Sequence, residues 1–350
     1  MDDLLAGVEA AAGLAVFGGS RASARRELVA DGTPGRLAGK DPTLWGTAAE
    51  ATARHRLGWI DGYRRSRELL PQIAELCEEL ADLDEVVVAH PATAASAIAR
   101  SLGVPLTVLD FDPPRVRDAV ADPDRLRRTV LVLADGAADG AADLRDEFWR
   151  AHRAAGRTEA ETSRHFVAVA ASGSALEKSA RDLGVLVLPA DPEVSGGYAA
   201  LTASALVPAA LAGVDVAELL DQAELLAPSL AGDTDNPALA LGVALTTSSG
   251  LIAVVNDGSG FEGLGDWAAE LLAAAGLRAV AVDDPGTAER STSGVLTIAY
   301  GGSLGTGGIP GGGVRPDVAI NGPLGAQFLA WQYAVAVAAV VGGSNPFTDN

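Results

Sequence analysis

The sequence predicts an α/β protein with two three-layer units, in each of which helices cover both faces of a parallel sheet. Short apolar runs rich in valine and leucine alternate with helical patterns between residues 85 and 188, and the alternation returns between residues 251 and 341. This pattern is typical of parallel sheets, whose strands are buried on both faces. A length of 350 residues also suits two domains.

The expected division is an N-terminal helical segment over residues 1–60, a first domain over 61–197, and bridging helices with a second domain over 198–350. A helix is expected from Ser66 to Leu80, ahead of the first sheet. Strands of the first domain are expected at Glu85–Ala89, Leu106–Leu109, Thr129–Leu133, His165–Ala170 and Val185–Leu188. Helical patterns lie between them, at Ala94–Leu102, Asp118–Ala121, Asp143–Ala155 and Ala175–Leu183.

The second domain repeats the pattern after bridging helices over Tyr198–Ala227. Its strands are expected at Leu251–Val255, Ala279–Val282, Gly294–Ala299 and Val318–Ile320, and its helices at Gly265–Ala275 and Ala326–Val341. The glycine-rich run Gly301–Gly313 is predicted to be a loop. The cleft between two such units is the expected binding site.

Charge and composition restrict the function. The chain has 26 lysines and arginines against 46 acidic residues, a formal net charge of −20. Such a surface repels nucleic acid and anionic membranes, and it repels a phosphorylated sugar unless a local basic pocket reverses the field. The single cysteine excludes an internal disulfide. Without an apparent signal peptide or an uninterrupted membrane-length apolar run, a cytoplasmic location is expected.

Four segments, in order along the chain, carry a family resemblance. They are Lys40-Asp-Pro-Thr-Leu-Trp-Gly46 with Arg56-Leu-Gly-Trp59, Ser172-Gly-Ser-Ala-Leu-Glu-Lys-Ser-Ala180, the stretch from Glu193 to Asp215, and Gly322-Pro-Leu-Gly-Ala-Gln-Phe328 with Asn345-Pro-Phe347. Together they resemble the glucose-6-phosphate isomerase family as it occurs in actinobacteria. The resemblance implies two sugar-isomerase (SIS) domains, a dimer with sites near the subunit interface, and aldose–ketose conversion of hexose phosphates without metal or organic cofactor.

By the same resemblance, this chain lacks the residues that this chemistry requires. The family's arginine after a Gly-Gly pair aligns with Gly197, beside Gly196. The catalytic carboxylate aligns with alanine at Ala274, within one residue, and no lysine follows Lys178. Proton transfer through an enediolate needs a carboxylate, and the developing oxyanion needs a cation. The resemblance therefore indicates a catalytically degenerate member.

The phosphate-binding loops have changed as well. The first loop reads His90-Pro-Ala-Thr-Ala-Ala95, in which Thr93 offers the one hydroxyl and His90 is either structural or a new functional group. The second loop places Asp135 where a lysine or its neighbour is expected. Carboxylates at contact distance from a phosphate are strongly unfavourable.

Other polar residues remain candidates. The spacing of Asp135, Asp139 and Asp143 suits the oxygen ligands of Mg²⁺ or Ca²⁺, but the favoured interpretation is a solvated loop with Asp143 as a helix N-cap, and no metal is predicted. Glu270, one helical turn before Ala274, is a weak substitute for the carboxylate. Thr202, for which a helix-capping role is the alternative, and Gln327 complete the expected cleft.

The leading hypothesis is a non-catalytic binding or regulatory protein of carbohydrate metabolism, with a small sugar as ligand. It would form a homodimer, or a heterodimer with an active isomerase subunit. An alternative is an enzyme for a changed, non-phosphorylated substrate that uses residues from the set His90, Asp135, Asp139, Thr202 and Gln327. A second alternative is residual isomerase activity on glucose 6-phosphate and fructose 6-phosphate.

Overall fold

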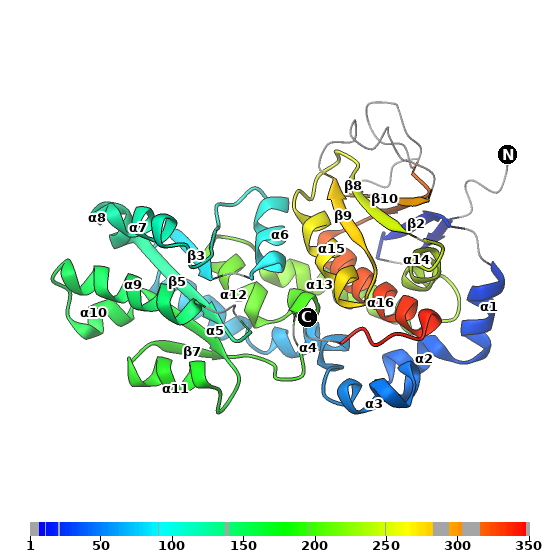
Figure 1. Cartoon of the computed structure of the whole chain (residues 1–350), viewed down its shortest axis with the longest axis horizontal. Coiled ribbons are helices and arrows are strands. Elements are labelled where there is room, and N and C mark those ends of the chain that lie inside the picture. Colours follow the sequence, from blue (N-terminus) through cyan, green and yellow to red (C-terminus); the bar gives the residue numbers. More distant parts are fainter. Residues whose placement is uncertain are drawn as a thin grey trace.

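The computed structural model describes residues 7–10, 12–19, 22–89, 91–136, 140–194, 196–248, 250–282, 294–302 and 316–347. It has two lobes, each built around one sheet, as Figure 1 shows. The first sheet has five parallel strands in the order β4-β3-β5-β6-β7. Their bounds are β3 (Glu85–Ala89), β4 (Thr107–Leu109), β5 (Thr129–Ala134), β6 (Phe166–Ala170) and β7 (Leu186–Pro189).

Helices cover both faces of the first sheet, because alternate strand residues point to opposite sides and both sets are apolar. One set packs against α5 (Leu70–Glu79), α6 (Thr93–Ser101) and α12 (Ala203–Leu211). The other set packs against α7 (Pro113–Ala121), α9 (Ala141–Ala154) and α11 (Ala175–Asp182). Two short helices lie among the outer ones, α8 (Pro123–Arg128) and α10 (Glu159–Ser163).

The second sheet has the order β1-β2-β11-β10-β8-β9. Its four parallel strands are β8 (Leu251–Asn256), β9 (Ala279–Val282), β10 (Val295–Gly301) and β11 (Val318–Asn321). All nine parallel strands of the two sheets lie where the sequence predicts them, with ends that differ by at most two residues. The predicted α/β class with parallel sheets is confirmed.

The N-terminal segment, expected to be mostly helical, also contains two strands. The hairpin of β1 (Gly7–Glu9) and β2 (Ala15–Gly18) adds two antiparallel strands to the second sheet, with β2 paired to β11. Short helices follow and lie against the second lobe in Figure 1. They are α1 (Ala22–Ala30), α2 (Thr33–Ala38), η2 (Pro42–Trp45), α3 (Thr47–Ala53), η3 (Gly58–Ile60) and α4 (Gly62–Arg67).

The helix predicted over Ser66–Leu80 is two helices. α4 ends at Arg67, and α5 begins at Leu70 with Pro71 in its first turn. Proline is well suited to the first turn of a helix but has no N–H for a preceding turn, so it marks a new start.

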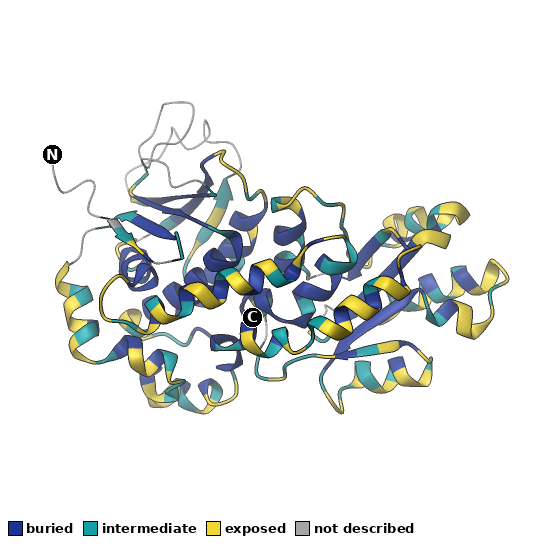
Figure 2. Ribbon diagram, turned by 180° about the vertical axis from the view of Figure 1, so that it is seen from behind, coloured by how far each residue is buried: buried dark blue, intermediate teal, exposed yellow. Residues whose placement is uncertain are grey.

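The bridge consists of η4 (Gly196–Leu201), α12, α13 (Val216–Ala231) and α14 (Pro237–Leu245). α15 (Leu264–Ala274) follows β8, and α16 (Leu324–Gly342) closes the second lobe. By length and hydropathy α16 is the one described helix able to cross a membrane, but 89% of its apolar window is buried inside the protein. It is therefore a core helix, packed between α13 and α14. Figure 2 shows both sheets buried behind helices whose outer faces are exposed.

Candidate functional site

A cavity of about 710 Å³ lies between the lobes, at the carboxyl ends of the first sheet. The ends of four strands open into it, at Ala89, Ala134, Ala171 and Ala190. The first turn of α6, the start of η4 and the second half of α15 form its other walls, with Pro346 and Phe347 near the chain's end. Its position is the usual one for ligands in open parallel sheets, and its size is that of small-molecule sites, roughly 300–1,000 Å³.

Small side chains dominate the lining of this cleft. Eleven of the residues that line it are alanines, and three more are glycines. The volume is therefore left open by short side chains, and the few polar groups present determine what can bind. Those groups are Arg56, Thr93, Asp135, Asp191, Ser204 and Glu270, together with Tyr198.

The charges in the cleft are mostly negative. Asp135, Asp191 and Glu270 contribute three carboxylates, and Arg56 contributes the one guanidinium. The described lining contains no lysine. A concave site with a net negative charge concentrates cations and repels anions.

Asp135 is held in place at the end of β5. Its backbone N–H donates to the carbonyl of Val169 on the neighbouring strand at 3.0 Å. Its carboxylate accepts a hydrogen bond from the N–H of Ala171, just after that strand. The side chain is half-buried, so it presents a fixed acceptor to the cleft.

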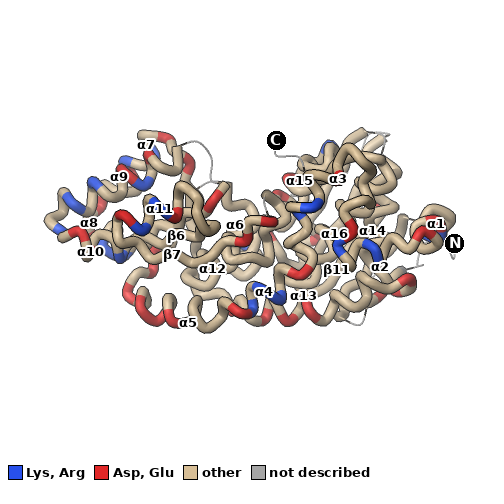
Figure 3. Tube along the Cα trace, turned by 90° about the horizontal axis from the view of Figure 1, so that it is seen from below, with Lys and Arg blue, Asp and Glu red and all other residues tan. Residues whose placement is uncertain are grey.

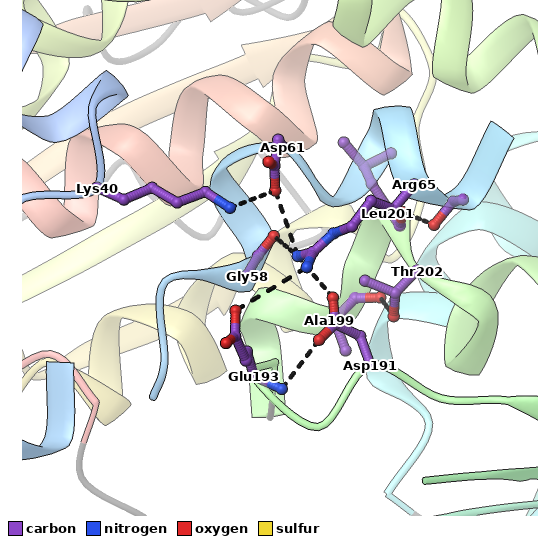
Figure 4. A network of polar contacts seen from close by, with 10 residues as sticks. Lys40, Gly58, Asp61, Arg65, Asp191, Glu193, Ala199, Leu201 and Thr202 are labelled. Atoms are coloured by element: carbon purple, nitrogen blue, oxygen red, sulfur yellow. Dashed lines mark hydrogen bonds and ion pairs between the residues drawn. The ribbon is translucent and has the colours of Figure 1, made fainter. Parts of the chain in front are cut away.

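Asp191 is fixed by an ionic network on the same wall, shown in Figure 4. The Arg65 guanidinium lies 2.6 Å from the Asp191 carboxylate, 3.3 Å from that of Asp61 and 3.9 Å from that of Glu193. Lys40 binds Asp61 from the other side at 2.6 Å. Both cations are therefore occupied by carboxylates, and neither brings unpaired positive charge to the cleft.

Gly197 lies where the resemblance places an arginine, and α15 fills the space that a side chain would need. A Cβ atom built on Gly197 would lie 3.2 Å from the Cα, Cβ and Cδ1 atoms of Leu271. The Gly197 carbonyl also accepts a 2.8 Å hydrogen bond from the buried indole N–H of Trp267 on the same helix. The glycine thus allows close packing of η4 on α15.

Glu270 lies on the cleft side of α15, and Ala273 and Ala274 line the wall after it. Ala274, which the resemblance aligns with the family's carboxylate, therefore lies in the cleft. Within the described part of the chain, the Glu270 carboxylate has no hydrogen-bond or ion-pair partner, and the residue is half-buried. Its carboxylate is available to a ligand.

The structure brings five of the predicted cleft residues together: Thr93, Asp135, Gly196, Gly197 and Glu270. Two others do not line the cavity. Thr202 is buried at the N-cap position of α12, but its hydroxyl donates to the carbonyl of Ala199 at 2.8 Å and makes no capping hydrogen bond. Gln327 is buried in α16 and donates to the carbonyls of Gly301 and Gly322.

Two predicted residues, His90 and Asp139, lie outside the described residues, as does most of the loop Gly301–Gly313. Asp143 is exposed in the first turn of α9, and Gly140, not Asp143, is the N-cap. Over the described ranges, no group of three or more His, Cys, Asp or Glu side chains is placed to hold a metal ion.

The polar lining residues that the sequence prediction missed are Arg56, Asp191, Tyr198 and Ser204. Asp191 directly follows β7, so the sequence places it at the carboxyl edge of the sheet and could have indicated a cleft residue. Arg56 enters from the N-terminal segment, far away in sequence, and had no such signal.

At the corresponding edge of the second sheet, described side chains occupy the space after β8 and β10. The Asp257 carboxylate, just after β8, accepts hydrogen bonds from the Ser259 N–H and the Asn321 amide, both at 2.8 Å. It fills the space beside Gly301, where a Cβ would lie 2.0 Å from its oxygen. Phe261, with a left-handed φ of 64°, packs its ring next to Gly302. Among the described residues, the open cleft thus belongs to the first sheet.

Comparison with known proteins supports the fold. No protein-family model and no curated protein matches the sequence. A hypothetical protein from Thermus thermophilus aligns with a TM-score of 0.72 and 17% identity, over 93% of this chain and 90% of that one. A glucose-6-phosphate isomerase from Chlamydia trachomatis aligns with a TM-score of 0.73 and 14% identity, over 97% of this chain and 86% of that one. The chain therefore has the fold of these proteins, including that of a sugar-phosphate isomerase.

Proposed function

We propose that this chain is a non-catalytic binding protein with a sugar-isomerase fold, which holds a small, hydroxyl-rich, uncharged or cationic molecule in the cleft. The supporting observation is the charge of the lining: it has one arginine and three carboxylates, of which Asp191 is paired with Arg65. Carboxylates accept hydrogen bonds from hydroxyl and ammonium groups. The same carboxylates oppose a phosphate dianion, which needs cations and N–H donors.

By the resemblance, two positions that would carry isomerisation have changed. Gly197 stands at the arginine position and Ala274 at the carboxylate position, and both line the cavity. Loss of an acid–base group or of an oxyanion donor each lowers a rate by roughly 10²–10⁴. Conversion of fructose 6-phosphate in a coupled assay is therefore expected to stay at background.

A thermal-shift screen tests the ligand class. Neutral sugars, polyols and amino sugars are expected to raise the melting temperature in a concentration-dependent manner, since binding to the native state stabilises it by mass action. Their phosphate esters are expected to have no effect. Stabilisation by fructose 6-phosphate but not by fructose would reject the proposal.

A charge-reversal variant tests whether the shift in melting temperature comes from binding in this cleft. Glu270→Arg should abolish the stabilisation by the neutral or cationic ligand and allow an anionic sugar to stabilise the protein. Asp118→Arg makes the same charge change on an exposed residue of α7 and should leave the ligand profile unaltered. Equal effects of the two variants would indicate long-range electrostatics instead of a site.

One observation favours a second candidate, an enzyme with changed chemistry. Glu270 is unpartnered among the described residues and shares the cleft with the fixed carboxylate of Asp135. Asp135→Asn and Glu270→Gln should each weaken binding by about tenfold, because a hydrogen bond to a charged group contributes roughly 1.5–3 kcal/mol. If a bound sugar were turned over and Glu270→Gln stopped turnover without changing affinity, the enzyme would replace the binding protein.

The proposal includes the oligomeric state and the cellular location of the protein. A cytoplasmic protein of this kind would act as a homodimer or together with an active isomerase subunit. Affinity purification of the tagged protein from its own cells, with identification of what elutes, is the direct measurement. Recovery without ligand or partner would argue against a binding role.

A further inference from the structure

One short segment supplies a large part of the cleft wall. Directly after β7, the cavity is lined by Asp191, Pro192, Val194, Gly196 and Gly197. We call residues 191–194, together with Gly196 and Gly197, the wall segment. It connects the first sheet to η4, and the side chains that hold it come from α4, none of whose residues lines the cavity.

Arg65 of α4 binds the start of the wall segment. Its guanidinium lies 2.6 Å from one oxygen of the Asp191 carboxylate and 3.9 Å from the carboxylate of Glu193, as Figure 4 shows. The other Asp191 oxygen accepts a 2.9 Å hydrogen bond from the Glu193 N–H. The Val194 N–H donates to the Asp191 carbonyl at 3.2 Å, which closes a turn. Both oxygens of this carboxylate are thus engaged, and Asp191 is held as part of the wall.

The path of the Arg65 side chain depends on a glycine in the N-terminal segment. The guanidinium also donates to the carbonyl of Gly58. A Cβ atom on Gly58 would lie 2.7 Å from Arg65 Nη2, 2.8 Å from the Cβ of Glu193 and 2.9 Å from Cγ2 of Val194. Glycine therefore allows the close approach of Arg65 to the wall segment.

The end of η4 is held by α4 as well. Ser66, the neighbour of Arg65, is buried, and its hydroxyl donates to the carbonyl of Leu201 at 2.8 Å. Leu201 is the last residue of η4. Figure 3 shows the basic residues of α4 between α5 and α13, which are mainly acidic. Two successive residues of one short helix thus anchor the stretch from the wall segment to the end of η4.

We propose that Arg65 is a positioning residue of the cleft, which acts through Asp191 to hold the wall segment where a ligand would contact it. A single exposed ion pair contributes little to stability, but an arginine that binds several acceptors at once contributes more. Without Arg65, the carboxylates of Asp191 and Glu193 would have no cation partner among the described residues. Their mutual repulsion would then displace the wall segment.

The sign of the effect on a cationic ligand separates positioning from charge. If Arg65 acted only through its charge, its removal would make the cleft more negative, and a cation would bind more tightly. If Arg65 positions the wall, its removal weakens the binding of cationic and neutral sugars alike. Only this readout rests on the proposed function, because the position of the wall segment is measurable without a ligand.

Hydrogen exchange of the full chain tests the position of the wall segment. Arg65→Met keeps the length of the side chain without its charge, and peptides that cover the wall segment should exchange about tenfold faster than in wild type, because local opening becomes easier. Asp191→Asn, which weakens the same ion pair from the other side, should have a similar effect. Unchanged protection of β5 would show that both variants are folded.

Arg67→Met is the matched control. Arg67 lies on the same helix, and its side chain is 35% exposed, against 40% for Arg65. Its guanidinium binds carboxylates of α13, those of Asp221 at 2.5 Å and Glu224 at 2.9 Å, and not the wall segment. This variant should leave the exchange of the wall segment at the wild-type rate.

Binding of glucosamine and of glucose to the same variants is the second readout. Arg65→Met should weaken both by about tenfold, since the wall that contacts the ligand is no longer preorganised, whereas Arg67→Met should not. Unchanged exchange of the wall segment in Arg65→Met, an equal increase in Arg67→Met, or tighter glucosamine binding by Arg65→Met would each overturn the proposal. If neither sugar binds the wild-type chain, the proposed function loses its support, and hydrogen exchange alone decides the role of Arg65.

Discussion

Lowering the pH from 7 to 5 is expected to reduce the free energy of unfolding by about 2 kcal/mol through one side chain, the imidazole of His152. His152 is fully buried at the end of α9, and its ring stacks on that of His165 with 4.2 Å between centroids. Burial above all, followed by the neighbouring His165 and Arg157 charges, lowers the pKa of His152 from 6.5 to about 3.

The geometry around His152 explains why its protonation is unfavourable. The Arg157 guanidinium lies 3.0 Å from His152 Nδ1. Because a guanidinium can only donate, Nδ1 must accept this hydrogen bond, and the ring proton sits on Nε2. Protonation would turn Nδ1 into a donor that faces a cation. His165 donates through its own Nδ1 to the carbonyl of Thr129 at 2.8 Å, and burial lowers its pKa as well.

The sign of the effect follows from linkage. The folded pKa lies below the unfolded value of about 6.5, so the unfolded chain binds the proton first as the pH falls. Stability is full above pH 6.5 and is lost steadily from there towards pH 3. Each pH unit in this window costs roughly 1.4 kcal/mol. Above pH 5 most carboxylates remain ionised, so the histidines dominate the change.

Urea unfolding of wild type and His152→Gln at pH 7, 6 and 5 measures this term. Glutamine can still accept from Arg157 but does not titrate, so most of the pH dependence should disappear in the variant. His55→Gln removes an exposed histidine and should keep the wild-type slope. Equal slopes for wild type and His152→Gln would contradict the assignment.

The strands were predictable because a strand that is buried on both faces of its sheet consists of an uninterrupted apolar run. Val86–Val88 and Val130–Leu133 are such runs, and turn segments do not contain them. The hairpin of β1 and β2 was missed for a physical reason. Its strands are three and four residues long, and β2 is held by pairing with β11, some three hundred residues later. The local sequence of β2 does not indicate that it pairs with a strand so far along the chain.

The topology of the candidate site was predictable from the sequence for residues that follow a strand. Asp135 comes directly after β5, and the carboxyl ends of parallel strands meet at one edge. Thr202 and Gln327 are polar residues of the expected type, but their side chains satisfy backbone carbonyls in the core. The sequence alone does not distinguish a polar side chain that binds a ligand from one that forms hydrogen bonds with the backbone.

Gly197, at the position where the resemblance implies an arginine, has a role in packing. Gly197 contacts Leu271 and accepts a hydrogen bond from Trp267, so η4 and α15 approach more closely than a larger side chain would allow. A larger side chain at this position would require a small shift of α15, which also carries Glu270 and Ala274. These residues of the cleft therefore belong to one packed arrangement.

Gly325→Ala is expected to destabilise the second lobe by about 3 kcal/mol, the upper part of the usual range for overpacking. Gly325 is the second residue of α16 and lies against the backbone of α13. A Cβ at this position would lie 2.0 Å from the carbonyl oxygen of Leu219 and 2.7 Å from its carbon. The Gly325 N–H also donates to the Gln222 amide at 2.8 Å.

The same substitution at Gly35 should have the opposite sign. Gly35 lies within α2, and no atom lies within 4 Å of the point that its Cβ would occupy, so alanine gains helix propensity, roughly 0.5–1 kcal/mol. Thermal and urea unfolding of the two variants should therefore move in opposite directions from wild type. If Gly325→Ala were as mild as Gly35→Ala, α16 would have to slide away from α13 at little cost. That result would mean that the helix core of the second lobe adjusts freely, and that the close approach at Gly325 is not what sets its packing.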